Sequence, residues 1–152
     1  MGPKFSLQAV LDFRHSRVES LEMELAKLQE TYRQGLEMQT QFQQTLAQVY
    51  IHLQEEQSGD LDLFKIDHLR QDAHSTKERL DQIKQALLTL AERVENKRLE
   101  IVTARQAEES LKILKEKENV RWQAEQVLVE SRQQDNVYIA QAFRRSNERS
   151  NV

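Results

Sequence analysis

Apolar side chains recur along the first third of the chain at alternating intervals of three and four residues. This first ladder runs from Leu7 to Leu53, and eleven of its fourteen positions are apolar, the exceptions being Arg14, Gly35 and Gln39. An average spacing of 3.5 residues is typical of the contact stripe of an α-helical coiled coil. The pattern therefore predicts a first long helix over residues of about 6–56.

A second ladder with the same spacing begins at Ile66. Its positions are Ile66, Leu69, Ala73, Thr76, Leu80, Ile83, Leu87, Leu90, Val94, Lys97, Ile101 and Ala104. Neither Pro nor Gly interrupts the chain after this point, so the helical pattern has no obvious stop signal before its end. We expect a second helix over residues of about 62–145.

The two ladders are separated by Ser58, Gly59 and Asp60, which we place in a tip of about residues 57–61. Gly59 can adopt the left-handed conformation that ends many helices, and Asp60 can cap the helix that follows. The alternative is one continuous helix that dimerises in parallel, which would leave Gly59 inside a helix at a cost of about 1 kcal/mol.

Folding the chain back at Gly59 brings both ladders into a single register. The expected pairs include Leu53 with Ile66, Tyr32 with Leu87 and Val18 with Ile101. The register match favours the turn over the continuous helix. The predicted fold is therefore all-α, a single domain formed by an antiparallel two-helix coiled-coil hairpin with an overhanging C-terminal helix.

The second helix is expected to be much longer than the first, which leaves residues of about 113–152 as an overhang without a partner in the chain. This segment carries aromatic and aliphatic residues among its charges, including Val120, Trp122, Val127 and Tyr138. Each such side chain contributes about 1.5–3 kcal/mol when fully buried. The overhang is interpreted as a partner-binding segment; self-association or a frayed end are the alternatives.

Composition narrows the functional classes. The chain has a net charge of −3, no cysteine, only 3 Gly and 1 Pro, and no long apolar run. A mildly acidic chain lacks the basic face that binds nucleic acid or an anionic membrane surface, and short apolar runs do not span a membrane. We expect a cytoplasmic protein that acts without nucleic acid.

No catalytic, cofactor or metal site is expected from the motifs. His15, His52, His68 and His74 do not form the paired spacing that binds a metal on one helix face. Asp60 is not followed by the Gly and Glu that a calcium-binding loop requires at its sixth and twelfth positions. Two paired helices also lack the enclosed pocket that catalysis needs, so an enzyme is not expected.

Both ends of the chain resemble the flagellar export protein FliJ family. The N-terminal "KFSLQAVLDFRHSRVESLEMELAKLQ" is similar to the start of that family, and "LKEKENVRWQAEQVLVESRQQDNVYIAQAFRR" to its C-terminal region. Glu130 and Asp135 fit the acidic pattern there, whereas Asn136 stands where the family usually has Glu. The resemblance spans the whole chain and includes the hairpin plan.

This resemblance implies a stalk of the type III export apparatus. Such a protein binds a hexameric export ATPase through the end that carries both termini, contacts a membrane export gate, and binds export chaperones. It is expected to be monomeric alone, peripheral to the inner membrane, and to hold no nucleotide. Whether the system is flagellar or a related secretion system stays open at this point.

The resemblance also suggests where each partner would bind. Val120, Trp122, Val127 and Tyr138 would face the ATPase, and the gate contact would lie near the tip, at Tyr50, Phe64, Phe42, Leu46 and Leu69. The last three also belong to the ladders, so core packing is the expected role for them. The runner-up function is a structural scaffold that homodimerises through the overhang.

Overall fold

The computed structural model describes residues 4–150 and contains two helices in this range, α1 (Gln8–Gln57) and α2 (Leu63–Ser150), with no strand. α1 has 50 residues and α2 has 88. The expected bounds were about 6–56 and 62–145, so α2 continues a few residues beyond its expected end. Residues 151–152 of the expected overhang lie outside the described range.

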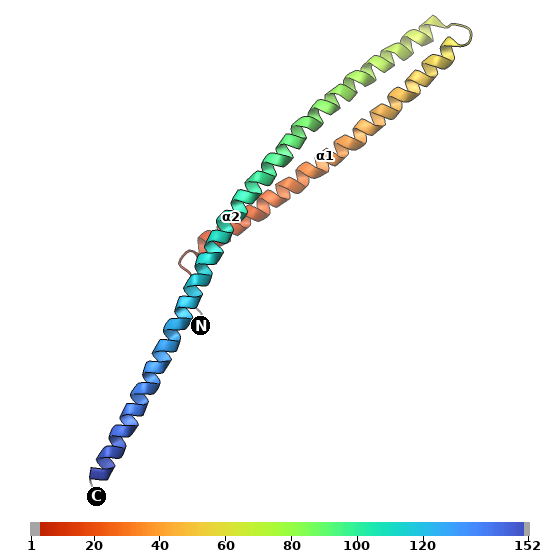
Figure 1. Cartoon of the computed structure of the whole chain (residues 1–152). Coiled ribbons are helices and arrows are strands. Elements are labelled where there is room, and N and C mark those ends of the chain that lie inside the picture. The colour runs from red at the N-terminus through yellow and green to blue at the C-terminus, as the bar shows by residue number, and fades with distance from the viewer. Residues whose placement is uncertain (1–3, 151–152) are drawn as a thin grey trace. The chain divides into compact units, whose positions relative to one another are not determined.

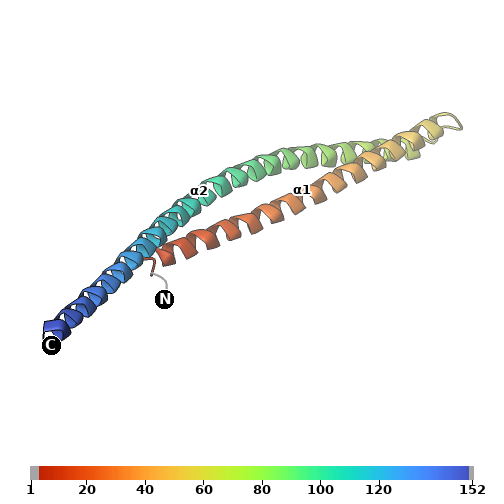
Figure 2. The same ribbon diagram turned by 60° about the horizontal axis from the view of Figure 1, so that its bottom comes forward.

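The chain divides into two compact units. Residues Arg17–Ala104 form the hairpin unit, and the described part of the terminal unit comprises residues 4–16 and 105–150. In the hairpin unit α1 and α2 run antiparallel from the turn that joins them, as Figures 1 and 2 show from two directions. The all-α hairpin predicted from the two ladders is confirmed.

The predicted ladders form the contact stripe of the hairpin unit, here called the seam. Every ladder position in this unit is buried or half-buried, and Leu21 is the most deeply buried at 1% exposure. The buried positions of α2 are Ile66, Ala73, Thr76, Leu80, Leu87 and Ile101. Heptad spacing thus identifies the core of this unit residue by residue.

Gly35, an exception in the first ladder, has a packing role. A Cβ atom added to it would lie 2.8 Å from Cδ2 of Leu87, so the Leu87 side chain fills the space that a larger residue would occupy. Register alone would place Leu87 opposite Tyr32. Side chains lean toward the N-terminus of their own helix, which for α2 is the end at the turn. Leu87 therefore leans past Tyr32 to Gly35, which lies three residues closer to the turn along α1.

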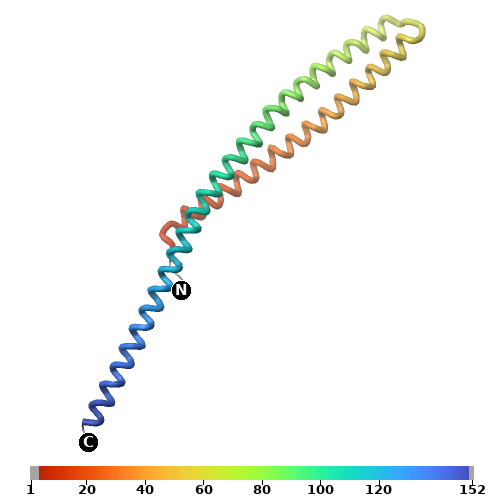
Figure 3. Tube along the Cα trace, viewed as in Figure 1, coloured from red at the N-terminus to blue at the C-terminus, as the bar shows by residue number. Residues whose placement is uncertain are grey.

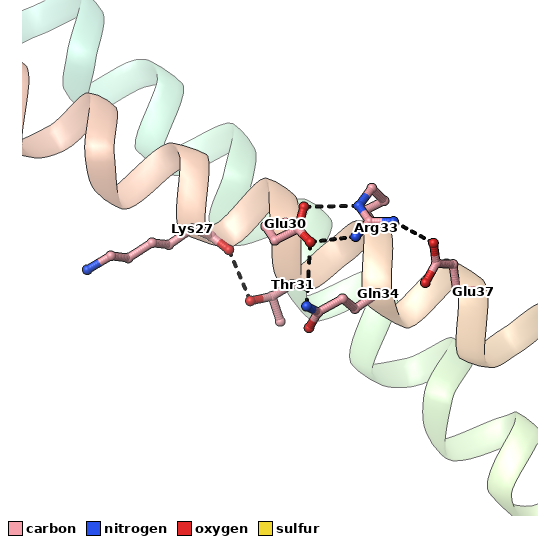
Figure 4. Close-up of polar contacts among 6 residues, drawn as sticks. All are labelled: Lys27, Glu30, Thr31, Arg33, Gln34 and Glu37. Atoms are coloured by element: carbon pink, nitrogen blue, oxygen red, sulfur yellow. Dashed lines mark hydrogen bonds and ion pairs between the residues drawn. The ribbon is translucent and has the colours of Figure 1, made fainter.

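An exposed polar network lies on α1 between Lys27 and Glu37, the part of the helix that includes Gly35 in the sequence (Figure 4). The Arg33 guanidinium donates hydrogen bonds to Glu30 at 2.6 and 3.0 Å and pairs with Glu37 on the next turn. The two carboxylates raise the pKa of Arg33, and the hydrogen bond from Arg33 lowers the pKa of Glu30. These contacts at spacings of three and four residues support the helix around a residue with poor helix propensity.

The turn lies at the predicted place, but its chemistry differs from the prediction. Gly59 has no positive φ, and no atom lies within 4 Å of the position where its Cβ would be. The cap of α2 is Asp62 and not Asp60: Asp62 Oδ1 accepts hydrogen bonds from the backbone amides of Phe64 and Lys65 at 3.1 and 3.3 Å. At the end of α1, Ser58 Oγ donates to the Glu55 carbonyl at 2.8 Å. Each helix end thus receives a side-chain hydrogen bond, from Ser58 and to Asp62, without a residue at positive φ.

In the terminal unit an apolar cluster secures the start of α1. Phe5, Leu11 and Leu111 are each less than a tenth exposed and pack together. Phe5 precedes the helix, and its carbonyl accepts a hydrogen bond from the Gln8 amide at 3.1 Å. Contact between a residue before a helix and one a turn inside it fixes how the chain enters the helix.

A buried carboxylate stands beside this apolar cluster. Glu108 is 6% exposed, and its Oε1 lies 2.6 Å from His15 Nδ1 and 3.3 Å from Lys112 Nζ. Nearby, Arg14 Nη1 donates to the Ala107 carbonyl at 2.8 Å. The hydrogen bond to His15 lowers the pKa of Glu108, with a smaller contribution from Lys112, although burial acts in the opposite direction.

α2 continues past the residues that α1 can cover. Trp122 is half-buried, and every residue from 123 to 150 is exposed. Figure 3 shows this part of α2, in blue, with no second helix beside it. We call residues 123–150 the terminal helix; the expected overhang began near residue 113.

Replacing Gly59 with Ala tests the turn. Because Gly59 has no positive φ and open space around it, Ala fits the native turn and restricts only the unfolded chain. We expect Gly59→Ala to raise the free energy of unfolding by about 0.4–1 kcal/mol, measured by urea denaturation. A destabilised variant would mean that Gly59 is left-handed after all.

Gly35→Ala is the matched control. Helix propensity alone predicts a gain of about 1 kcal/mol for this substitution. The full gain should not appear, because the new methyl group would meet Leu87.

The buried carboxylate predicts a specific acid sensitivity. Because the pKa of Glu108 is below its ordinary value of 4.5, its stabilising effect is complete above that value and is lost as pH falls through the lowered pKa. Glu108→Gln should lower stability at neutral pH and flatten the decline between about pH 5 and pH 3, as followed by urea denaturation. The control is Glu109→Gln, at an exposed neighbour. Equal acid slopes for Glu108→Gln and the wild type would contradict this role.

Candidate partner-binding surfaces

The five tip residues singled out in the sequence fall into two groups. Phe64 is 85% exposed and Tyr50 is 42% exposed, whereas Phe42, Leu46 and Leu69 are half-buried along the seam. This distribution matches the expectation that the seam residues pack in the core. Phe64 and Tyr50 are the two whose side chains are available to a partner.

An open groove lies beside the turn, between the two helices. We call it the tip groove; it has a volume of about 530 Å³ and is lined by His52, Glu56, Phe64, Lys65, His68 and Leu69. It brings together two of the predicted residues, Phe64 and Leu69, with four others. Tyr50 lies outside the groove, and the Lys77 ammonium covers its ring at 5.4 Å from the ring centroid.

The tip groove combines an apolar surface with titratable groups. His52 lies 3.6 Å from Glu55, and His68 lies 3.7 Å from Asp72, each within its own helix. Lys65 and the two imidazoles face a groove whose only carboxylate among the lining residues is Glu56. Such a lining suits an apolar side chain that is accompanied by a polar or acidic group.

Sequence reasoning did not identify His52, Lys65 and His68 as groove residues. His52 and Lys65 immediately precede the seam residues Leu53 and Ile66. A residue that precedes a seam position lies at the edge of the contact stripe. That spacing is the signal that could have placed them beside the inter-helix groove.

The terminal helix forms the second surface. Val127 and Tyr138 are 64% and 73% exposed, and Val120, just before the terminal helix, is 57% exposed. Trp122, the fourth predicted residue, is half-buried. The other exposed apolar residues of this region are Leu128, Val129, Val137, Ile139 and Phe143.

These apolar residues do not form a single stripe. They include two runs of three successive residues, 127–129 and 137–139, and each run covers roughly 200° of the circumference at about 100° per residue. A partner that contacted one face would leave several of them in water. Burial of the whole set requires a partner that surrounds the helix.

The described residues show no structure that points to a metal or to a membrane span. Within residues 4–150, no three His, Cys or acidic residues are placed to hold a metal ion. Neither helix in the same range has a stretch apolar enough to cross a lipid bilayer. His15 is exposed, and its Nδ1 lies within hydrogen-bond distance of the buried Glu108.

Comparisons with known proteins identify the family. A model of the family described as "Flagellar FliJ protein" matches residues 3–148. Searches of curated proteins and of solved structures found no significant match. The family match covers nearly the whole chain, both units included. The chain therefore belongs to the flagellar FliJ family, a non-enzymatic family with a role in flagellar protein export.

Proposed function

We propose that this protein is a stalk-like adaptor of the flagellar export apparatus, whose terminal helix inserts into the central opening of the hexameric export ATPase. The observation that carries this proposal is the distribution of apolar side chains on the terminal helix. Val127, Leu128 and Val129 point in three directions and are all about half exposed or more. A ring that surrounds the helix can bury all three, whereas a flat or grooved partner cannot.

A partner that surrounds the terminal helix would gain a large free energy from burying its apolar side chains. Each fully buried aliphatic or aromatic side chain contributes about 1.5–3 kcal/mol. Eight such residues between Val120 and Phe143 are exposed in the chain alone. Part of this gain offsets the cost of association, so the affinity depends on how completely the partner encloses the helix.

The tip is proposed to contact the membrane export gate. Phe64 and Tyr50 supply exposed aromatic surface there, and the tip groove adds a recess next to Phe64. Aromatic residues of this kind dominate the binding energy of many interfaces. Export chaperones are a third class of partner that the family resemblance suggests, to which we assign no surface.

The ATPase contact is tested by removing the terminal helix. The full chain should stimulate turnover of the cognate export ATPase, and a chain ending at Trp122 should not, while keeping the Phe5–Leu111 packing and the hairpin unit. A less disruptive variant, Ile139→Ser with Phe143→Ser, should weaken ATPase binding by at least about a hundredfold.

Leu99→Ser, at a residue of the hairpin unit that is 59% exposed, is the matched control and should stimulate normally. The mass of the protein in solution is measured alongside turnover. Stimulation that survives truncation would refute the insertion of the terminal helix. A stable dimer without stimulation would instead support the homodimeric scaffold.

The gate contact is tested at the tip. Phe64→Ala and Tyr50→Ala should weaken binding to the gate protein, measured by calorimetry, while leaving helicity unchanged. Phe64 makes little packing in the chain, and Tyr50 loses only its contact with Lys77, worth about 0.5–1 kcal/mol. Leu99→Ala serves as the control, and unfolding of either tip variant or unchanged affinity would count against the contact.

A further inference from the structure

A second open groove lies along the hairpin unit, away from the turn. We call it the side groove; it has a volume of about 520 Å³. α1 contributes Lys27, Leu28 and Thr31, and α2 contributes Arg93, Asn96 and Lys97, with Glu24 and Glu100 at its edge. Leu28 and Lys97 belong to the seam, so the floor of this groove is the contact stripe itself.

The side groove and the tip groove lie on the same flank of the seam. Thr31 and His52 on α1 are separated by a multiple of seven residues, as are Lys65, Arg93 and Glu100 on α2. Residues seven apart lie on the same side of a coiled-coil helix. We call this side the groove flank.

The opposite flank is differently covered. Tyr50 and Lys77 follow the seam residues Val49 and Thr76, and the Lys77 side chain extends over the Tyr50 ring. On the groove flank the corresponding positions hold both short residues, such as Thr31, Thr45 and Ala86, and long ones, such as Met38 and Arg79. Thr31 lines the side groove together with the seam residue Leu28, so a short side chain leaves the seam accessible at this place.

The residues that line the side groove carry more positive than negative charge. Lys97 Nζ holds both edge carboxylates, at 2.8 Å from Glu24 and 3.3 Å from Glu100. The Lys97 hydrogen bond lowers the pKa of Glu24, so that carboxylate is firmly ionised and already paired. Lys27 and Arg93 form no ion pair with any described residue. A ligand in this groove would meet the Leu28 side chain and two cations that form no ion pair, Lys27 and Arg93, beside the already paired Lys97.

We propose that the side groove docks an acidic amphipathic helix of another protein, which completes a three-helix bundle with α1 and α2. Its apolar stripe would cover Leu28 and the neighbouring half-buried seam residues, and its Asp or Glu residues would lie beside Lys27 and Arg93. Laying the apolar face of a helix into a groove is a common mode of peptide recognition. This surface is separate from the terminal helix and from the tip contact.

A pair of synthetic peptides tests the proposal. Both are amphipathic helices with the same leucine stripe; one carries Glu and the other Lys along the edges of the stripe. The full chain should bind the Glu peptide at least about tenfold more tightly than the Lys peptide, and added salt should reduce this preference. Binding is measured by titration calorimetry on the full chain, with its mass in solution measured alongside.

Two sets of variants locate the binding to the side groove. Thr31→Trp should fill the groove and weaken binding of the Glu peptide by about tenfold or more, whereas Thr40→Trp should leave it unchanged. The two threonines match because each is exposed and each donates to a carbonyl four residues earlier, at 3.0 and 3.1 Å. Circular dichroism checks that every variant keeps its helicity.

Charge reversal gives an independent readout. Lys27→Glu with Arg93→Glu should abolish the preference for the Glu peptide, while Lys84→Glu with Arg70→Glu, on the opposite flank, should retain it. Equal binding of the two peptides, no binding of either, or equal effects of the paired variants would overturn the proposal. A homodimer that is lost in Thr31→Trp would also overturn it, because a second copy would then occupy the groove.

Discussion

Two paired helices have no interior apart from the stripe along which they touch. In the hairpin unit that stripe is the seam, and each helix buries only the residues that recur every three and four positions. Every other residue faces water or a partner. The turn, the polar contacts that cross between the helices and the grooves at the edge of the seam all take their positions from this contact.

Two charged residues on the contact stripes between the helices, Lys97 and Glu108, are tolerated because each has a partner of opposite charge. Lys97 occupies a seam position, with its side chain 19% exposed, and forms ion pairs with two carboxylates at once. Glu108 is buried where the spacing calls for an apolar residue, and it is held by His15 and Lys112. An unpaired charge in such a place is strongly destabilising, so each pair penalises other registers of the two helices. Gly35 contributes to the same specificity by shape, since it accepts Leu87.

Heptad spacing predicted the fold and the core, because burial in a coiled coil follows directly from residue position. Val18, Leu21 and Ile101 are buried where the ladders place them. The chemistry of the turn was beyond this reasoning: with Asp60 and Asp62 only two residues apart, the cap depends on the backbone path and not on composition. Spacing also could not show that Phe5 packs on Leu111, because that contact forms outside any regular ladder.

The terminal helix could be predicted from the sequence as a candidate surface, whereas the two grooves could not. Exposed apolar residues on the terminal helix could be read from the sequence, since nothing in the chain was left to pair with them. The grooves could not, because they depend on which short side chains, such as Thr31, fail to cover a seam flank. The residues just before the seam positions identify which side chains border a groove. Whether a groove is open there depends on how far each of these side chains extends over the seam.

The terminal helix and the side groove would require different kinds of partner. On the terminal helix, apolar side chains occupy most of the circumference, and only an enclosing partner removes them all from water. In the side groove Leu28 is the one apolar residue of the lining, beside Lys27 and Arg93, so the proposed occupant is a single helix of opposite charge. If both proposed contacts form, burial drives the first and charge orients the second, so only the second should weaken markedly as salt rises. The salt dependence of binding would therefore distinguish the two proposed contacts.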